Sequence, residues 1–115
     1  MGEAEEDWSL RAGRLLKELG INNKNMPYRY LSAALKMTMD GALPGPEMWL
    51  AIGGWYGKRS EAVRGSCRRS IRAAYERDPL NFCNVLDDLY FIPPRLGEFL
   101  VVASKLLRCH RHPPI

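Results

Sequence analysis

Basic side chains concentrate in one stretch of this sequence, and their spacing is that of a helix face. Residues 57–77 hold seven Lys and Arg residues against two acidic ones, whereas the whole chain has a formal net charge of +4. Arg64, Arg68 and Arg72 follow one another at intervals of four residues, which places them along one ridge of an α-helix. Guanidinium groups in such a row can donate hydrogen bonds to the base edges and phosphates of nucleic acid. The stretch therefore predicts a surface for double-stranded DNA, with a merely solvated helix face as the alternative.

The residues around this stretch have the spacing of a helix-turn-helix over residues 49–77. In that motif the first helix needs a small residue where the second helix crosses it, a glycine-tolerant turn four positions later and an apolar residue six positions beyond. Gly53, Gly57 and Val63 meet these three requirements. Ser60 is expected to be the N-cap of the second helix. Gly54 has no role in this pattern, although a glycine inside a helix costs about 1 kcal/mol relative to alanine.

The second helix of this motif is expected to enter the major groove with residues 60–72. The N-terminal part of a recognition helix reaches base edges, whereas the turn and the later residues meet phosphates. We therefore expect Arg64, followed by Arg68, to contact bases. Phosphate contacts are expected from Lys58, Arg59, Arg69 and Arg72. The full set of predicted DNA-contacting residues is Lys58, Arg59, Ser60, Arg64, Gly65, Arg68, Arg69 and Arg72.

The periodicity of apolar residues along the rest of the chain predicts an all-α fold. Gly20 is expected to end the first helix, Pro27 to begin the second, and Asp78-Pro79 to separate the fourth from the fifth. The chain's 115 residues suffice for one buried core and are too few for two ordinary domains. The expected helices, about six around one core, cover about residues 5–19, 27–40, 46–56 and 60–77, a short stretch from 79, and about 95–109.

Cysteine usage and hydropathy indicate the compartment. Cys67, Cys83 and Cys109 are odd in number and widely spaced, which argues against a disulfide framework and favours a reducing, cytoplasmic setting. No apolar run approaches the roughly 18 residues that a membrane span needs. We therefore expect a cytoplasmic protein with no membrane association, bound to the bacterial nucleoid when it is on DNA.

Other reactive residues do not form a catalytic or metal-binding pattern. Cys109-His110-Arg111-His112 lacks further nearby ligands of the kind that a zinc site needs, so a solvated tail is expected there. The carboxylates of Asp87-Asp88 diverge if the pair lies on a helix, and a solvated helix end is the expected reading. No nucleophilic triad and no phosphate-binding glycine loop is present. We expect no enzyme activity, no cofactor, no metal and no small-molecule substrate.

The order of several short motifs resembles a known family. These are KELGI at 17–21, YRYLSAAL at 28–35, the run Ile52, Tyr56, Val63, Arg68, Ile71, Ala74 and Tyr75, and EFLVVASKLLR at 98–108. From about Trp8 to His110 the chain resembles the C-terminal effector domain of the sporulation-initiation response regulator of endospore-forming bacteria (the stage-zero sporulation A protein family). The resemblance implies a six-helix domain that binds promoter DNA through its fourth helix, with a homodimer or tandem copies on the DNA.

The expected division of the chain into domain and tails follows, with two differences between this sequence and the family. With the acidic residues at the start of the chain, we expect an acidic N-terminal tail at residues 1–7, a sporulation-regulator-like effector domain at 8–110 and a C-terminal tail at 111–115. Arg68 and Arg69 match positions that contact DNA in the family. Arg64-Gly65 stands where the family has an acidic residue followed by an arginine that read bases, and the family's receiver domain is not in this sequence. We therefore expect a transcription regulator whose target sequence differs from that of the family.

A protein-interaction module is the competing interpretation. It would use the same fold to dock another regulator through Trp49, Trp55 and the arginine face, without specific DNA binding. Trp49 and Trp55 are six residues apart, so on one helix they face different directions. One is expected in the core, and the other is expected to be exposed.

Overall fold

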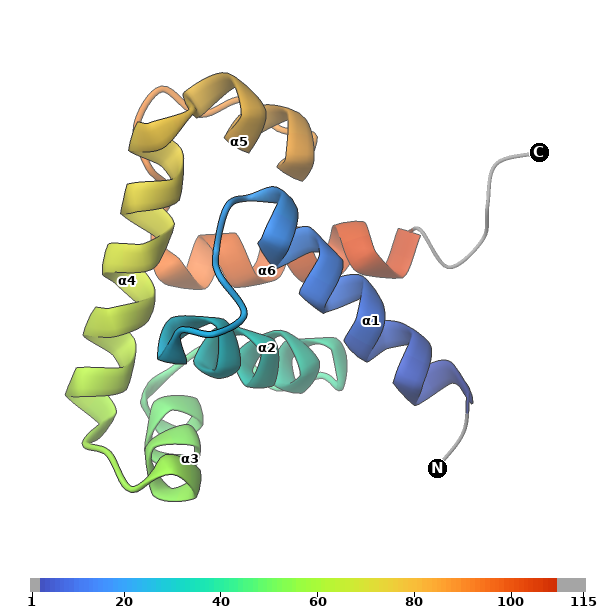
Figure 1. The fold of residues 1–115 in the computed structure, drawn as a ribbon. Coiled ribbons are helices and arrows are strands. Elements are labelled where there is room, and N and C mark those ends of the chain that lie inside the picture. Colours follow the sequence, from blue (N-terminus) through green and yellow to red (C-terminus); the bar gives the residue numbers. More distant parts are fainter. Residues whose placement is uncertain (1–2, 110–115) are drawn as a thin grey trace.

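Six α-helices make up the computed structural model, which describes the backbone of residues 3–109 and the side chains of residues 9–108 (Figure 1). No strand occurs within the described residues. The chain is therefore all-α, which confirms the predicted fold class. The helices are α1 (Glu3–Glu18), α2 (Met26–Met39), α3 (Pro46–Tyr56), α4 (Ser60–Arg77), α5 (Pro79–Leu86) and α6 (Leu96–Cys109).

The C-terminal end of α1 lies where its sequence predicts, whereas its N-terminal end does not. Gly20 adopts a left-handed φ of +88°, and its N–H donates to the carbonyl of Lys17 at 2.9 Å. The N–H of Ile21 donates to the carbonyl of Leu16 at 2.9 Å, which completes a Schellman motif. Gly20 thus ends the helix as predicted. At the other end α1 begins at Glu3, so residues 3–7 belong to this helix and do not form a separate acidic tail.

α2 forms the centre of the molecule. It packs against α1, α3, α4 and α6, while α4 runs across one end of both α2 and α6 (Figure 1). α3 lies at the N-terminal end of α4, and α5 lies at its C-terminal end. The largest fully buried side chains come from all six helices: Leu16, Leu31, Leu35, Ile52, Val63, Cys67, Ile71, Phe82, Leu86, Phe99 and Leu100. These helices therefore share one core, and α4 forms its edge.

The end of α5 determines which of the following residues are buried. α5 ends at Leu86, and Asp87 adopts a left-handed φ of +55°. The chain turns there, so Leu89 is 69% exposed. Leu100 of α6, by contrast, is fully buried.

Contacts from α4 and α5 hold the end of α1 in place. The Asp78 carboxylate accepts a hydrogen bond from the backbone N–H of Asn81 at 3.1 Å and so caps α5. The side-chain amide of Asn81 donates to the carbonyl of Glu18 at 2.9 Å. Arg77 donates through Nη1 to the carbonyl of Gly20 at 3.2 Å. These bonds satisfy carbonyls that the last turn of α1 leaves without a helical partner, and they fix the C-terminal end of α4 against α1.

Candidate nucleic-acid interface

The turn between α3 and α4 brings two backbone segments into very close approach. Gly57 has a left-handed φ of +66°, and the N–H of Lys58 donates to the carbonyl of Gly53 at 2.8 Å. A β-carbon on Gly53 would lie 2.5 Å from the carbonyl oxygen of Lys58, a distance that β-carbons do not adopt. Only glycine fits at this point of α3. The predicted close approach at Gly53 and the turn at Gly57 are therefore confirmed for this α3–α4 unit (residues 46–77).

The start of α4 differs from the prediction by one residue. Ser60 is the first residue of the helix, and Arg59 occupies the N-cap position with extended backbone angles. The carbonyl of Arg59 accepts the first helical hydrogen bond, from the N–H of Val63 at 3.1 Å. No side chain caps this end of the helix. The prediction that Ser60 is the N-cap is wrong, because the turn after Gly57 is one residue shorter than that assignment requires.

The inner face of α4 is apolar and completely buried. It consists of Val63, Cys67, Ile71 and Ala74. Ile71 is buried, whereas its neighbour Ser70 is only half-buried. Burial raises the pKa of the Cys67 thiol from 9.0 to about 12. The thiolate is therefore not available at neutral pH, and Cys67 acts as an apolar core residue.

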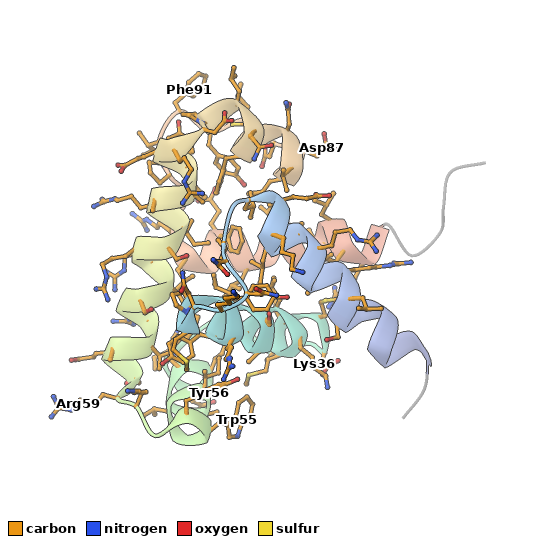
Figure 2. All side chains as sticks on the ribbon, viewed as in Figure 1. Lys36, Trp55, Tyr56, Arg59, Asp87 and Phe91 are labelled. Atoms are coloured by element: carbon orange, nitrogen blue, oxygen red, sulfur yellow. The ribbon has the colours of Figure 1, made fainter. Side chains whose placement is uncertain are left out.

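The outer face of α4 carries arginines that the fold does not use. Arg64, Arg68, Arg69 and Arg72 are all exposed. In the part of the chain that the structure describes, the four have no hydrogen bond and no ion pair. The predicted residues of the turn, Lys58 and Arg59, are also exposed, and the side chain of Arg59 projects away from the start of α4 (Figure 2). The structure thus places six predicted cations on α4 and the turn before it, free to meet a partner.

Two glycines inside helices have no packing reason. A β-carbon on Gly65 would meet only the guanidinium nitrogen Nη1 of Arg69, at 3.2 Å, which is the end of a flexible side chain. A β-carbon on Gly54 would meet nothing within 4 Å. Each glycine costs the helix about 1 kcal/mol relative to alanine. Gly65 lies in the middle of the arginine face, where its missing side chain leaves the helix backbone accessible.

One flank of α4 forms a groove that we call the basic groove. Arg64, Arg68 and Arg72 line one side of it, residues 92–96 line the other, and its volume is about 690 Å³. The second side includes Arg95, which is also exposed. Sequence reasoning missed Arg95, because it follows Pro93-Pro94 in a connector and comes beside α4 only through the tertiary fold.

The connector is held against α4 by aromatic contacts. The hydroxyl of Tyr75 donates to the carbonyl of Tyr90 at 2.9 Å. The ring of Phe82 makes edge-to-face contacts with those of Tyr75 and Tyr90, with centroids 5.5 and 5.9 Å apart. The two prolines that follow restrict the backbone further. The start of the connector that carries Arg95 is therefore held against α4 and α5.

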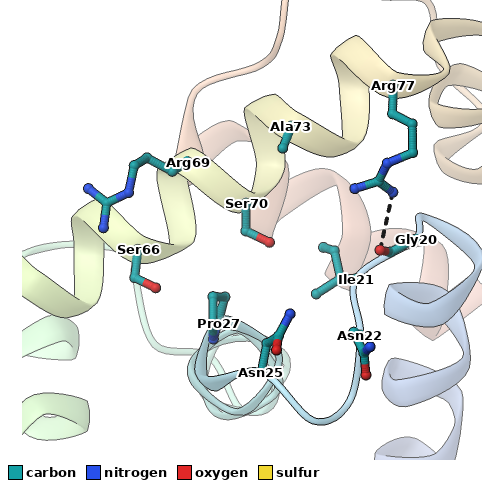
Figure 3. A pocket seen from close by; sticks show the side chains of 10 residues that line it. All are labelled: Gly20, Ile21, Asn22, Asn25, Pro27, Ser66, Arg69, Ser70, Ala73 and Arg77. Atoms are coloured by element: carbon teal, nitrogen blue, oxygen red, sulfur yellow. Dashed lines mark hydrogen bonds between the residues drawn. The ribbon is translucent and has the colours of Figure 1, made fainter.

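The opposite flank of α4 faces the turn between α1 and α2, and we call the space there the polar hollow (Figure 3). It has a volume of about 300 Å³. Ser66 and Ser70 point their hydroxyls toward Asn25 and Pro27, whereas the guanidinium group of Arg69 lies at the outer end, away from them (Figure 3). Arg77, the seventh basic residue of the predicted stretch, donates to Gly20 here and is not part of the arginine face.

The two tryptophans of α3 divide between core and surface, as expected. Trp49 is buried, whereas Trp55 is 63% exposed. Trp55 extends away from the helices at the same end of the molecule as Arg59 (Figure 2). The neighbouring Tyr56 is half-buried and packs edge-to-face on Tyr30 of α2, with ring centroids 5.3 Å apart. α3 is thus anchored through Trp49 and Tyr56, and Trp55 takes no part in the core.

Other kinds of site receive no support from the described residues. Among them, no three His, Cys, Asp or Glu side chains come together as metal ligands would. The segment Cys109 to His112 lies outside the described side chains. None of the described helices combines the length and the apolar character that crossing a membrane requires. Asp87 and Asp88 lie at the end of α5, both exposed, as expected for a solvated helix end.

Comparison of the chain with known protein families, with curated proteins and with solved structures gives no match.

Proposed function

We propose that this chain binds double-stranded DNA, with the α3–α4 unit acting as a helix-turn-helix and α4 as its recognition helix. An α-helix is about 10–12 Å across with its side chains, and the major groove of B-DNA is about 12 Å wide. α4 lies at the edge of the core and its outer face is open along residues 60–72. The helix is therefore accessible to a groove of that size.

Gly65 is the observation that carries the proposal. It lies mid-helix between unpaired arginines, and no atom of the fold requires the absence of a side chain there. A glycine is used where a backbone must approach a ligand closely. A DNA backbone or base edge in contact with α4 at Gly65 would account for a residue that otherwise only weakens the helix.

The cations around Gly65 have the chemistry that such a partner needs. Arg64 lies in the first half of α4 and is assigned to base edges, where arginine pairs best with guanine. Arg68 is assigned to a base or an adjacent phosphate. Lys58 and Arg59 in the turn, with Arg69 and Arg72, are assigned to phosphates. Ser60 is assigned a minor polar contact at the start of the helix.

The finer role proposed is that of a transcription regulator acting in the bacterial cytoplasm. The resemblance to the sporulation-regulator effector domain supports promoter DNA as the target, with a dimer or tandem copies as the bound form. Arg64-Gly65 replaces the base-reading pair of that family, so the proposed target sequence is different. Selection of bound duplexes from a random pool would define it.

Salt dependence tests the proposal directly. The four assigned phosphate contacts, from Lys58, Arg59, Arg69 and Arg72, predict that the affinity for a selected duplex falls roughly 10²-fold between about 50 and 200 mM salt. Arg69→Ala is expected to weaken binding similarly for all duplexes, and Arg64→Ala to change the preferred sequence as well. Arg14→Ala removes an exposed arginine from α1 and is the matched control. Absence of binding by the wild-type chain at low salt would contradict the proposal.

The exposure of Trp55 favours a second candidate, the docking of another regulatory protein. Leu50 of the same helix is also 63% exposed, so α3 presents two large apolar side chains to solvent. In that case Trp55→Ala would abolish capture of the partner, and Arg68→Ala, on the arginine face that this interpretation also uses, would weaken it less. DNA binding predicts the reverse ranking of these two variants on a duplex.

A further inference from the structure

The basic groove brings four guanidinium groups together from two separate parts of the chain. Three come from α4 and one, Arg95, from the connector before α6. Among residues 9–108, whose side chains the structure describes, no carboxylate lines the groove. None of the four arginines has a hydrogen bond or ion pair within the described part of the chain. The positive charge converging here is therefore not compensated by the fold.

α6 adds to this charge. It begins at Leu96, which itself lines the groove, and the carbonyl of Arg95 accepts a hydrogen bond from the N–H of Phe99 at 2.8 Å. The N-terminal end of a helix carries a partial positive charge. Glu98 lies in the first turn of α6 but is not among the residues that line the groove.

The rest of the groove is apolar, which narrows the kind of ligand that fits. Ile92 is 74% exposed and contributes to the lining, together with Pro93 and Pro94. A polymer that alternates anionic groups with less polar ones matches such a surface. The phosphodiester strand of DNA, with its deoxyriboses between phosphates, has this character, and most protein–DNA hydrogen bonds go to phosphate and sugar.

The position of the groove matches the path of a DNA strand. When a helix fills the major groove, the two backbones pass along its two flanks. The basic groove occupies one flank of α4 along Arg64, Arg68 and Arg72, which is about two helical turns. The polar hollow on the opposite flank of α4 has a smaller volume than the basic groove, and α4 contributes the hydroxyl groups of Ser66 and Ser70 to it.

We infer that the basic groove holds one phosphodiester strand of the bound duplex, with Arg95 as a phosphate ligand from outside the α3–α4 unit. This inference rests on the proposed function. It extends the DNA-contacting surface to the connector at residues 92–96. The contacts between Tyr75, Phe82 and Tyr90 then have a second role. They stabilise the fold and also hold the connector whose Arg95 binds a phosphate of the DNA.

Titration of Arg95→Ala with a duplex tests the inference. Loss of one phosphate contact reduces the slope of log affinity against log salt concentration by about 1. The affinity should fall by the same factor for the selected duplex and for a scrambled one, because phosphates carry no sequence information. Arg95→Lys is expected to retain most of the slope, and Arg14→Ala the whole of it. Unchanged thermal unfolding of Arg95→Ala, followed by circular dichroism, would show that the fold is retained.

The outcomes separate this inference from the proposed function. If the wild-type chain binds duplexes and Arg95→Ala has the wild-type slope, the groove does not hold the strand, while DNA binding by α4 stands. If Arg95→Ala changes only the sequence preference, the residue reads bases and the inference is also overturned. If the wild-type chain binds no duplex at low salt, both fail, and binding of a poly-glutamate peptide that depends on Arg95 would identify an acidic protein as the ligand.

Discussion

The residues on the inner face of α4 have clear roles in packing, whereas the residues on its outer face do not. On the inner face, Val63, Cys67 and Ile71 are buried against the other helices, and each side chain has a packing role. On the outer face, the arginines have no hydrogen-bond or ion-pair partner among the described residues, and Gly65 has no neighbour there that requires it. The fold thus accounts for one face and leaves the other unexplained. Where neither packing nor an internal contact accounts for the type of a residue, contact with a binding partner can account for it.

Replacing one residue of each face should give the largest contrast in stability. Ile71→Ala removes a buried side chain from the core and is expected to lower the free energy of unfolding by about 2–5 kcal/mol. Arg72→Ala, the next residue along the helix, is exposed and should change it by less than about 0.5 kcal/mol. Urea denaturation of both variants measures the difference. Similar losses in the two variants would mean that the outer face also supports the fold.

A second pair of variants separates the glycines of α3. Gly53→Ala forces a β-carbon against the carbonyl oxygen of Lys58 and is expected to destabilise the chain by about 1–3 kcal/mol. Gly54→Ala meets no atom and should stabilise it by roughly 0.5–1 kcal/mol. Thermal unfolding of the two variants measures whether each change lowers or raises the stability. A stabilising Gly53→Ala would contradict the close turn between α3 and α4.

The thiol of Cys67 makes the inner face sensitive to alkaline pH. Its pKa is raised from 9.0 to about 12 by burial, so the unfolded chain loses this proton at a lower pH than the folded chain does. The associated stability is fully present below pH 9 and is lost as the pH rises from 9 toward 12. The expected loss between pH 8 and 10 is about 1.4 kcal/mol.

Cys67→Ala is the control for that pH dependence. It removes the titrating group, so denaturation curves at pH 8 and 10 should move closer together than those of the wild-type chain. An equal loss of stability in both proteins would show that other groups cause it and that the thiol is not desolvated.

Gly65→Ala has a small expected effect on stability and gives the sharpest test of the outer face. The variant should raise the free energy of unfolding by up to about 1 kcal/mol, because alanine favours the helix and no close backbone contact opposes it. The same variant should weaken duplex binding, because the added methyl group separates α4 from the DNA. Gly54→Ala stabilises a helix in the same way and should leave binding unchanged. Full duplex affinity in Gly65→Ala would remove the main support for the DNA proposal.

Local patterns in the sequence predict the parts of the structure that depend on neighbouring residues. The spacing of Gly53 and Gly57 predicts the turn, because close approach and a left-handed φ are requirements of single positions. Helical periodicity predicts that Arg64, Arg68 and Arg72 lie outside. It does not reveal how far neighbouring helices wrap around α4, and therefore does not predict that Ile71 is buried while Ser70 is half-buried.

Tertiary contacts determine what the sequence did not predict. Arg95 comes beside α4 through the tertiary fold, in which Tyr75 donates to the carbonyl of Tyr90 and Phe82 contacts both of their rings. No local pattern around Pro93-Pro94 encodes that contact. The exposure of Leu89 likewise depends on the left-handed Asp87, a conformation that is uncommon for a residue other than glycine. One half of the candidate site is therefore local in origin, and the other half is a product of the fold.

An NMR titration of the uniformly ¹⁵N-labelled chain with a duplex at low salt tests the central claim most directly, since it reports every backbone amide at once and needs no knowledge of the target sequence. The account predicts shifts concentrated at residues 58–72, with a second group at residues 92–96 and none along the first half of α1. Shifts centred on Trp55 and Leu50, or no shifts with any duplex, would contradict it.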